Sequence, residues 1–105
     1  MRVMGTNRWE MDVDTDFLID QALDFADMVK AQGVAQLVGA WVQPEKKLMW
    51  CTWTTEDLEA LQVAFDGMNE QSGLTSELSV VEEMFPERTG RNELEAQLLS
   101  GAGLA

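Results

Sequence analysis

The sequence contains no histidine and no tyrosine, and it has one cysteine and two prolines among 105 residues. Histidine is the commonest general base near neutral pH and a frequent zinc ligand, so its absence excludes much of enzyme chemistry. One cysteine cannot form an intramolecular disulfide. No spacing of acidic residues matches a calcium-binding loop. We therefore expect neither a metal nor a cofactor.

Positive charge and long hydrophobic runs are also scarce. Seven lysine and arginine residues stand against 19 aspartate and glutamate residues, giving a net charge of -12. Such a chain repels phosphate backbones and anionic lipids, so we expect no nucleic-acid and no membrane partner. The apolar runs are far shorter than the roughly 18 residues that cross a bilayer, and residues 1–5 lack the apolar region of a signal peptide. We expect a cytoplasmic protein.

The remaining composition is that of a single folded domain. Apolar residues make up 46% and charged residues 25% of the chain. A chain of this length buries enough surface for one core but not for two. The composition changes after Pro86, so we predict one domain over residues 1–86. Residues 87–105 are predicted to form a linker, a short C-terminal helix over residues 92–100 and a frayed tail.

Two segments carry apolar residues at the spacing of one helix face. The first is predicted to begin with a cap at residues 14–15 and to end at Gly33. The second is predicted to begin with a cap at residues 54–55 and to end at Gly73. The apolar positions are Leu18, Ala22, Phe25 and Val29 in the first segment and Leu58, Leu61, Phe65 and Met68 in the second.

Four further segments are typical of strands. Residues 43–46 separate the two middle segments and predict a β-hairpin with a short polar loop. The resulting order, β-α-β-β-α-β, is that of an α+β ferredoxin-like fold, a four-stranded antiparallel sheet with both helices on one face. The predicted strands cover residues 3–10, 34–42, 47–54 and 75–85.

The predicted hairpin carries apolar residues on both faces. Simple alternation places Val34, Val38, Ala40 and Val42 on one face and Ala35, Leu37 and Trp41 on the other. In the next strand Leu48 and Trp50 oppose Met49, Cys51 and Trp53. The two helices cover one face only, and soluble monomers rarely expose a large apolar patch. We therefore expect a homodimer formed through the open sheet faces.

The element order, the length and the doubly apolar hairpin resemble the dimeric α+β barrel superfamily over about residues 1–86. The resemblance implies a dimer in which two sheets pack face to face. Members of that superfamily include cofactor-independent monooxygenases, lactone isomerases, haem-binding proteins and binding proteins without a known activity. Several of these enzymes and haem sites use a histidine, which this chain lacks. That difference disfavours the haem-dependent and histidine-dependent members.

Large apolar side chains on or beside the predicted sheet are candidate ligand contacts. Indole rings form pocket walls and donate hydrogen bonds, and methionines adapt to a flexible apolar ligand such as a fatty acyl chain. The same residues would also serve as ordinary packing in the core and in a dimer interface. The candidates are Trp9, Trp41, Met49, Trp50, Trp53 and Met84, with Met4, Met11 and Met68 as further cavity-lining methionines.

Three polar residues are candidate anchors for a ligand: Asn7, Arg8 and Gln36. An amide or a guanidinium inside an apolar cavity can bind a carboxylate or polarise a carbonyl. Alternation sends Asn7 and Arg8 to opposite faces, so at most one points into a given cavity. An edge or rim position is the alternative for each. Cys51 is expected to be a buried structural thiol, because the chain has no histidine to activate it.

These patterns favour a small dimeric protein that binds an apolar, fatty-acid-like molecule or hydrophobic metabolite in a cavity lined by sheet residues. The superfamily resemblance implies an alternative, a cofactor-independent monooxygenase or isomerase that acts on a small organic substrate. A dimeric structural or interaction module is the second alternative. It would have a densely filled interior.

Overall fold

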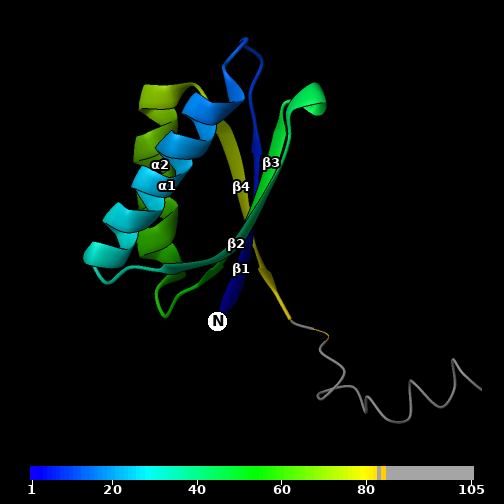
Figure 1. The fold of residues 1–105 in the computed structure, drawn as a ribbon. Helices are drawn as coiled ribbons and strands as arrows, with labels where there is room; N and C mark the ends of the chain where they lie inside the picture. Colours follow the sequence, from blue (N-terminus) through cyan, green and yellow to red (C-terminus); the bar gives the residue numbers. More distant parts are fainter. Residues whose placement is uncertain (83, 85–105) are drawn as a thin grey trace, which may run out of the picture.

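The computed structural model describes residues 1–82 and residue 84, and its element order is β-α-β-β-α-β (Figure 1). The C-terminal helix predicted over residues 92–100 lies outside the described residues. No helix in the described part is both long and apolar enough to span a membrane. The elements are β1 (Arg2–Arg8), α1 (Thr15–Ala31), β2 (Gln36–Gln43), the short 3-10 helix η1 (Pro44–Lys46), β3 (Leu48–Thr54), α2 (Leu58–Ser72) and β4 (Thr75–Val81).

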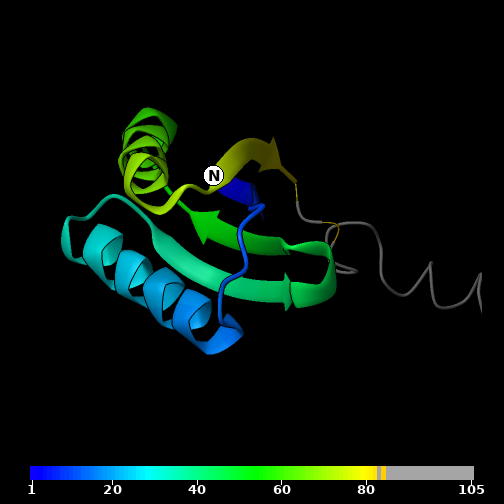
Figure 2. The ribbon, with the colours of Figure 1, turned by 90° about the horizontal axis from the view of Figure 1, so that it is seen from above.

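The four strands form one sheet in the order β2-β3-β1-β4, and every neighbouring pair is antiparallel. Both helices pack against the same face of this sheet (Figure 2). The predicted ferredoxin-like α+β fold is therefore confirmed. No described residue forms a layer over the other face, which we call the open face.

The predicted fourth strand is too long, because β4 ends at Val81. Val81 pairs with Arg2, the first residue of β1. β1 therefore offers β4 no further partner, so Glu82 and Met84 lie beyond the strand. Glu83 and Phe85, which the prediction also placed in this strand, lie outside the described residues.

A β-bulge in β2 overturns the simple alternation predicted for this strand. Leu37 pairs with Trp53 and Gly39 pairs with Thr52, which leaves Val38 as an extra residue. One extra residue reverses the phase of the side chains that follow it. Leu37 and Ala40 therefore face the helices together, and the prediction that they face opposite sides is wrong. Val42 lies on the helix side as well, since it pairs with the buried Met49.

The helix ends differ in how well their amide groups are capped. Asp57, rather than the predicted Thr54 or Thr55, is the N-cap of α2, and its carboxylate accepts a hydrogen bond of 3.0 Å from the Ala60 amide. Asp14 is the N-cap of α1 but forms no side-chain cap hydrogen bond. Gly73 ends α2 with φ of 74°, a left-handed conformation that glycine adopts without strain.

Two groups of buried side chains lie between the helices and the sheet. In the first, the rings of Phe25, Trp53 and Phe65 pack edge to face, and the Phe25 and Phe65 centroids are 4.8 Å apart. This aromatic contact joins α1 to α2. The first group is Val3, Phe25, Ala26, Val29, Ala35, Cys51, Trp53, Leu61 and Phe65, and the second is Trp9, Leu18, Met49 and Leu74.

Candidate functional site

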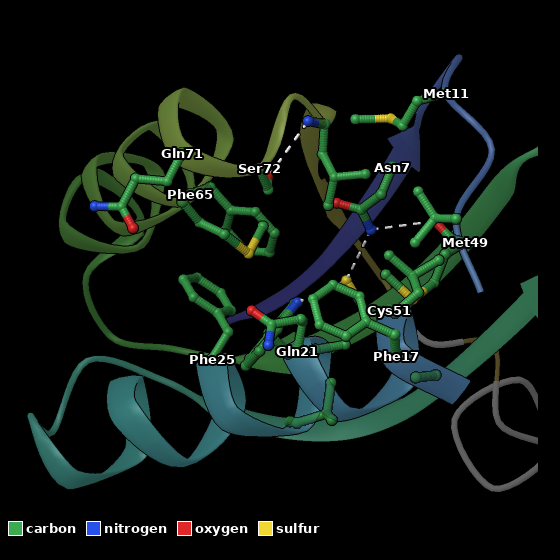
Figure 3. A pocket seen from close by; sticks show the side chains of 18 residues that line it. Asn7, Met11, Phe17, Gln21, Phe25, Met49, Cys51, Phe65, Gln71 and Ser72 are labelled. Atoms are coloured by element: carbon green, nitrogen blue, oxygen red, sulfur yellow. Dashed lines mark hydrogen bonds between the residues drawn. The ribbon is translucent and has the colours of Figure 1, made fainter. Parts of the chain in front are cut away.

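A cavity of about 400 Å³ lies between α1, α2 and the helix-facing side of the sheet (Figure 3). Its volume falls in the range of small-molecule sites, roughly 300–1,000 Å³. Eighteen of the described residues line it: Asn7, Met11, Val13, Phe17, Leu18, Gln21, Ala22, Phe25, Leu37, Ala40, Met49, Cys51, Trp53, Phe65, Met68, Gln71, Ser72 and Leu74.

The apolar stripes of the two helices explain why the space stays open. Phe25 on α1 meets Phe65 on α2 and closes one end. One turn before Phe25, the stripe of α1 has the small side chain of Ala22, which also lines the cavity. Met68 on α2 packs against both core groups. The helices are thus held together at the phenylalanine pair, while the short Ala22 side chain leaves the neighbouring turn unfilled.

Asn7 forms the polar floor of the cavity and is 1% exposed. Its amide nitrogen donates to the Met49 carbonyl at 3.1 Å and to Cys51 Sγ at 3.4 Å, as drawn in Figure 3. Its Oδ1 accepts a hydrogen bond from the Ser76 hydroxyl. Within the described residues, no buried side-chain nitrogen or oxygen lacks a hydrogen-bond partner. Asn7 is therefore satisfied by the protein itself and ties β1 to its two neighbours in the sheet.

Among the described residues, Cys51 is the only titratable one that lines the cavity. Its sulfur accepts hydrogen bonds from Trp53 Nε1 at 3.0 Å and from the Asn7 amide, and its thiol faces the Gly5 carbonyl at 3.8 Å. Burial raises the pKa of the thiol, and this effect outweighs the hydrogen bonds, which lower it. At neutral pH Cys51 is therefore a protonated thiol, which is a poor nucleophile.

The open side of the cavity is marked by its exposed lining residues. Met11 and Phe17 are 40% and 58% exposed. Gln21 on α1 and Gln71 on α2 are also exposed, and their side chains make no hydrogen bond within the described part of the chain. Ser72 Oγ accepts a hydrogen bond from the Leu74 amide at 3.3 Å. The mouth therefore combines apolar surface with neutral polar groups.

The structure brings three of the predicted ligand-binding residues together in this cavity: Asn7, Met49 and Trp53. Trp9 is buried beside Met49 in the second core group but does not line the cavity. Met11 and Met68, two of the further methionines, also line it.

The other predicted site residues lie elsewhere. Trp41 pairs with Trp50 on the open face, and Arg8 lies on the same face because it alternates with the buried Asn7. Gln36 lines a separate, smaller hollow at one end of the sheet. Met84 is 84% exposed and lies beyond β4.

Of the helix residues that line the cavity, only Met68 was predicted from the sequence as a cavity residue. The others are Phe17, Leu18, Gln21, Ala22, Phe25, Phe65, Gln71 and Ser72. For two of these residues, Ala22 and Gln21, the sequence of α1 contains a pattern that could have indicated a cavity. Ala22 is a small residue in a stripe of large ones, and Gln21 is a polar residue next to it. For Gln71 and Ser72, at the end of α2, we find no comparable signal.

The comparisons with known proteins support the fold. No protein-family model matches the chain, and no curated protein matches it. The chain is similar to a solved structure titled "Structural Genomics, protein YJCS", with a TM-score of 0.53 and 14% sequence identity. The match covers 77% of this chain and 97% of that chain. At this identity the likeness concerns the fold alone.

Proposed function

We propose that the protein binds a small apolar molecule in the cavity between α1, α2 and the sheet. The observation that carries this proposal is the cavity of about 400 Å³ beside the core of a small domain. Protein interiors are close-packed, and few of their voids exceed the size of a water molecule. A densely filled interior, as expected of a purely structural module, would leave no such space.

The character of the lining supports an apolar ligand. Thirteen of the lining residues are alanine, valine, leucine, methionine, phenylalanine or tryptophan. Met11, Met49 and Met68 contribute unbranched, polarisable side chains that adapt to ligands of different shape. The hydrogen bonds of Asn7, Cys51 and Trp53 hold the floor in place before any ligand arrives. A preformed apolar site with few polar groups is typical of small-molecule binding.

The chemistry of the lining favours binding over catalysis. General acid–base catalysis is most effective when the pKa of the catalytic group lies near the working pH. Cys51, the one titratable lining residue in the described part of the chain, has a pKa that burial moves further above neutrality. The monooxygenase or isomerase activity implied by the superfamily resemblance would therefore have to use hydrogen bonds alone, as in oxyanion stabilisation.

We also propose that a second copy of the chain covers the open face, as in the dimeric α+β barrel superfamily. Trp41 is 58% exposed on this face and pairs with Trp50 on the next strand. Met4 and Leu48 alternate with buried residues of β1 and β3, so they lie on this face too. Glu77 and Arg8 occupy different strands of the same face. A twofold axis would allow these opposite charges to pair between subunits.

The test is the binding of Nile red, a neutral apolar dye, followed by its fluorescence. Ala22→Phe fills the cavity, so we expect at least a tenfold loss of affinity with little loss of stability. Leu23→Phe adds a ring to the neighbouring residue, which is 51% exposed, and should leave the affinity unchanged. Equal affinity of the wild type and Ala22→Phe, with both folded, would contradict the proposal. Ala22→Leu provides a smaller filling residue if Ala22→Phe unfolds.

Native mass spectrometry of the freshly purified wild type tests the dimer and the ligand together. We expect a dimer that carries extra mass, and we expect this mass to disappear on denaturation. A monomer at micromolar concentration would contradict the proposed sheet-to-sheet assembly.

A further inference from the structure

Resting on the proposed function, we infer that the ligand is electrically neutral and that Gln21 and Gln71 hydrogen-bond its hydroxyl or carbonyl group. A neutral ligand is a narrower class than the fatty-acid-like molecule or hydrophobic metabolite expected from the sequence, because it excludes molecules with a free carboxylate. Three observations carry the inference: the uncharged lining, the acidic surroundings of the mouth and the two glutamines among the exposed lining residues.

None of the eighteen lining residues carries a formal charge, in a protein with a net charge of -12. An ion transferred into an apolar site without a partner of opposite charge loses far more hydration energy than a neutral group does. The cationic residues closest in the sequence to a lining residue are Arg8, next to Asn7, and Lys47, two positions before Met49. Arg8 lies on the open face, and the Nζ of Lys47 forms a salt bridge of 3.1 Å with Oδ1 of Asp12. Within residues 1–82 and residue 84, the cavity therefore has no lining cation to receive a carboxylate.

The surroundings of the mouth oppose an anion as well. Asp20 follows the mouth residue Phe17 by three positions on α1, and Asp24 follows Gln21 by three. Residues three apart on a helix are neighbours on its surface. Both aspartates are exposed and lie outside the lining. Their negative charge raises the energy of an anion near the mouth and lowers that of a cation, with partial screening by salt. The exclusion of a cation therefore rests on the uncharged, apolar lining.

Gln21 and Gln71 supply the neutral polar groups. They come from the two different helices that border the cavity, and both side chains are without a hydrogen bond within the described residues. In Figure 3 the Gln71 amide points away from the cavity, so it reaches a ligand only after rotation about its side-chain bonds, which no hydrogen bond restrains. Each amide has two donor hydrogens and an acceptor oxygen. A hydroxyl or a carbonyl matches this set, whereas a carboxylate is best matched by a guanidinium.

The test compares probes with one naphthalene ring and different charge, titrated into the full-length wild type by calorimetry at pH 7.5. The probes are 1-naphthalenemethanol, 1-naphthoate and 1-naphthylmethylammonium. We expect the alcohol to bind at least tenfold more tightly than either ion. If the carboxylate or the ammonium binds as tightly as the alcohol, and Ala22→Phe abolishes that binding, the inference of neutrality is wrong while the proposed site stands. If no probe binds, or Ala22→Phe changes nothing, the proposed function itself fails.

The role of the amides is tested with 1-methylnaphthalene, which lacks the hydroxyl. Gln21→Leu and Gln71→Leu should each reduce the preference for the alcohol over the hydrocarbon several-fold, while the hydrocarbon binds at least as well as before. Gln32→Leu, at the exposed end of α1, is the matched control and should leave the preference unchanged. An undiminished preference in both mouth variants would overturn the assignment of the amides.

Discussion

Gly5 lies directly opposite Cys51 in the β1–β3 ladder, and a Cβ atom on Gly5 would lie 2.9 Å from Cys51 Sγ. The same atom would lie 3.3 Å from Leu78 Cδ2 on the other neighbouring strand. The cysteine sulfur therefore fills the space that a side chain at position 5 would need. This explains a glycine in the middle of a central strand, where glycine otherwise weakens a sheet.

Gly5→Ala is expected to destabilise the fold by about 1–3 kcal/mol, the usual range for an overpacked core. Cys51→Ala removes the sulfur, so Gly5→Ala should cost less in that background. Urea unfolding of the wild type, both single variants and the double variant gives the coupling, which we expect to be about 0.5–3 kcal/mol. An equal cost of Gly5→Ala in both backgrounds would show that the two residues do not compete for space.

The raised pKa of Cys51 predicts a loss of stability in alkaline solution. A cysteine in the unfolded chain loses its proton near pH 8.5, whereas the buried thiol of the folded chain keeps it to a higher pH. Between the two pKa values the unfolded state binds fewer protons, so the free energy of unfolding falls as pH rises. The chain has no tyrosine whose titration would obscure the effect.

Urea unfolding at pH 7.5 and at pH 10 checks this. From pH 7.5 to pH 10, the free energy of unfolding of the wild type should fall by more than that of Cys51→Ala. If both proteins lose the same amount, the thiol pKa is not raised by folding.

Substitution of two phenylalanines that line the cavity, Phe65 and Phe17, should affect stability and ligand affinity to different degrees. Phe65 is 1% exposed and closes the inner end, so Phe65→Ala should cost about 3–5 kcal/mol of unfolding free energy. Phe17 is 58% exposed at the mouth, so Phe17→Ala should change stability by no more than about 0.5 kcal/mol. Phe17→Ala should nevertheless weaken the binding of 1-naphthalenemethanol several-fold. Unchanged affinity, measured by calorimetry, would mean that the ligand does not reach the mouth.

A charge on the open face should break the proposed dimer. Trp41→Glu places a carboxylate in the expected interface, and it should give a folded monomer in light scattering coupled to size-exclusion chromatography. Val63→Glu is the control, because Val63 is 65% exposed on α2, on the other side of the molecule. A dimer that persists in Trp41→Glu, or that is lost equally in Val63→Glu, would place the interface elsewhere.

The element order could be predicted because hydrophobic periodicity follows burial closely in this chain. Leu18, Phe25, Leu61 and Phe65, which define the two helix stripes, are all buried. The bulge at Val38 was not predictable in the same way. Val38 is as apolar as its neighbours, and only the pairing with β3 shows that it is the extra residue. Periodicity in a single strand does not report where its partner skips a residue.

The site could be predicted only in part. Asn7 stands out as an amide among apolar sheet residues, and alternation correctly separates its face from that of Arg8. Which helix residues line the cavity depends on the distance between α1 and α2. The contact of Phe25 with Phe65 sets this distance. That contact joins residues 40 positions apart. No local pattern in the sequence contains it.

The most direct test of the central claim uses the seven methionines as internal probes. Met11, Met49 and Met68 line the cavity, whereas Met1, Met4, Met28 and Met84 do not. Methyl NMR of methionine-labelled protein, titrated with 1-naphthalenemethanol, should shift the signals of the three lining residues and leave the other four in place. If Met4 on the open face shifts and Met49 on the cavity floor does not, the ligand binds to the opposite side of the sheet and the account is wrong.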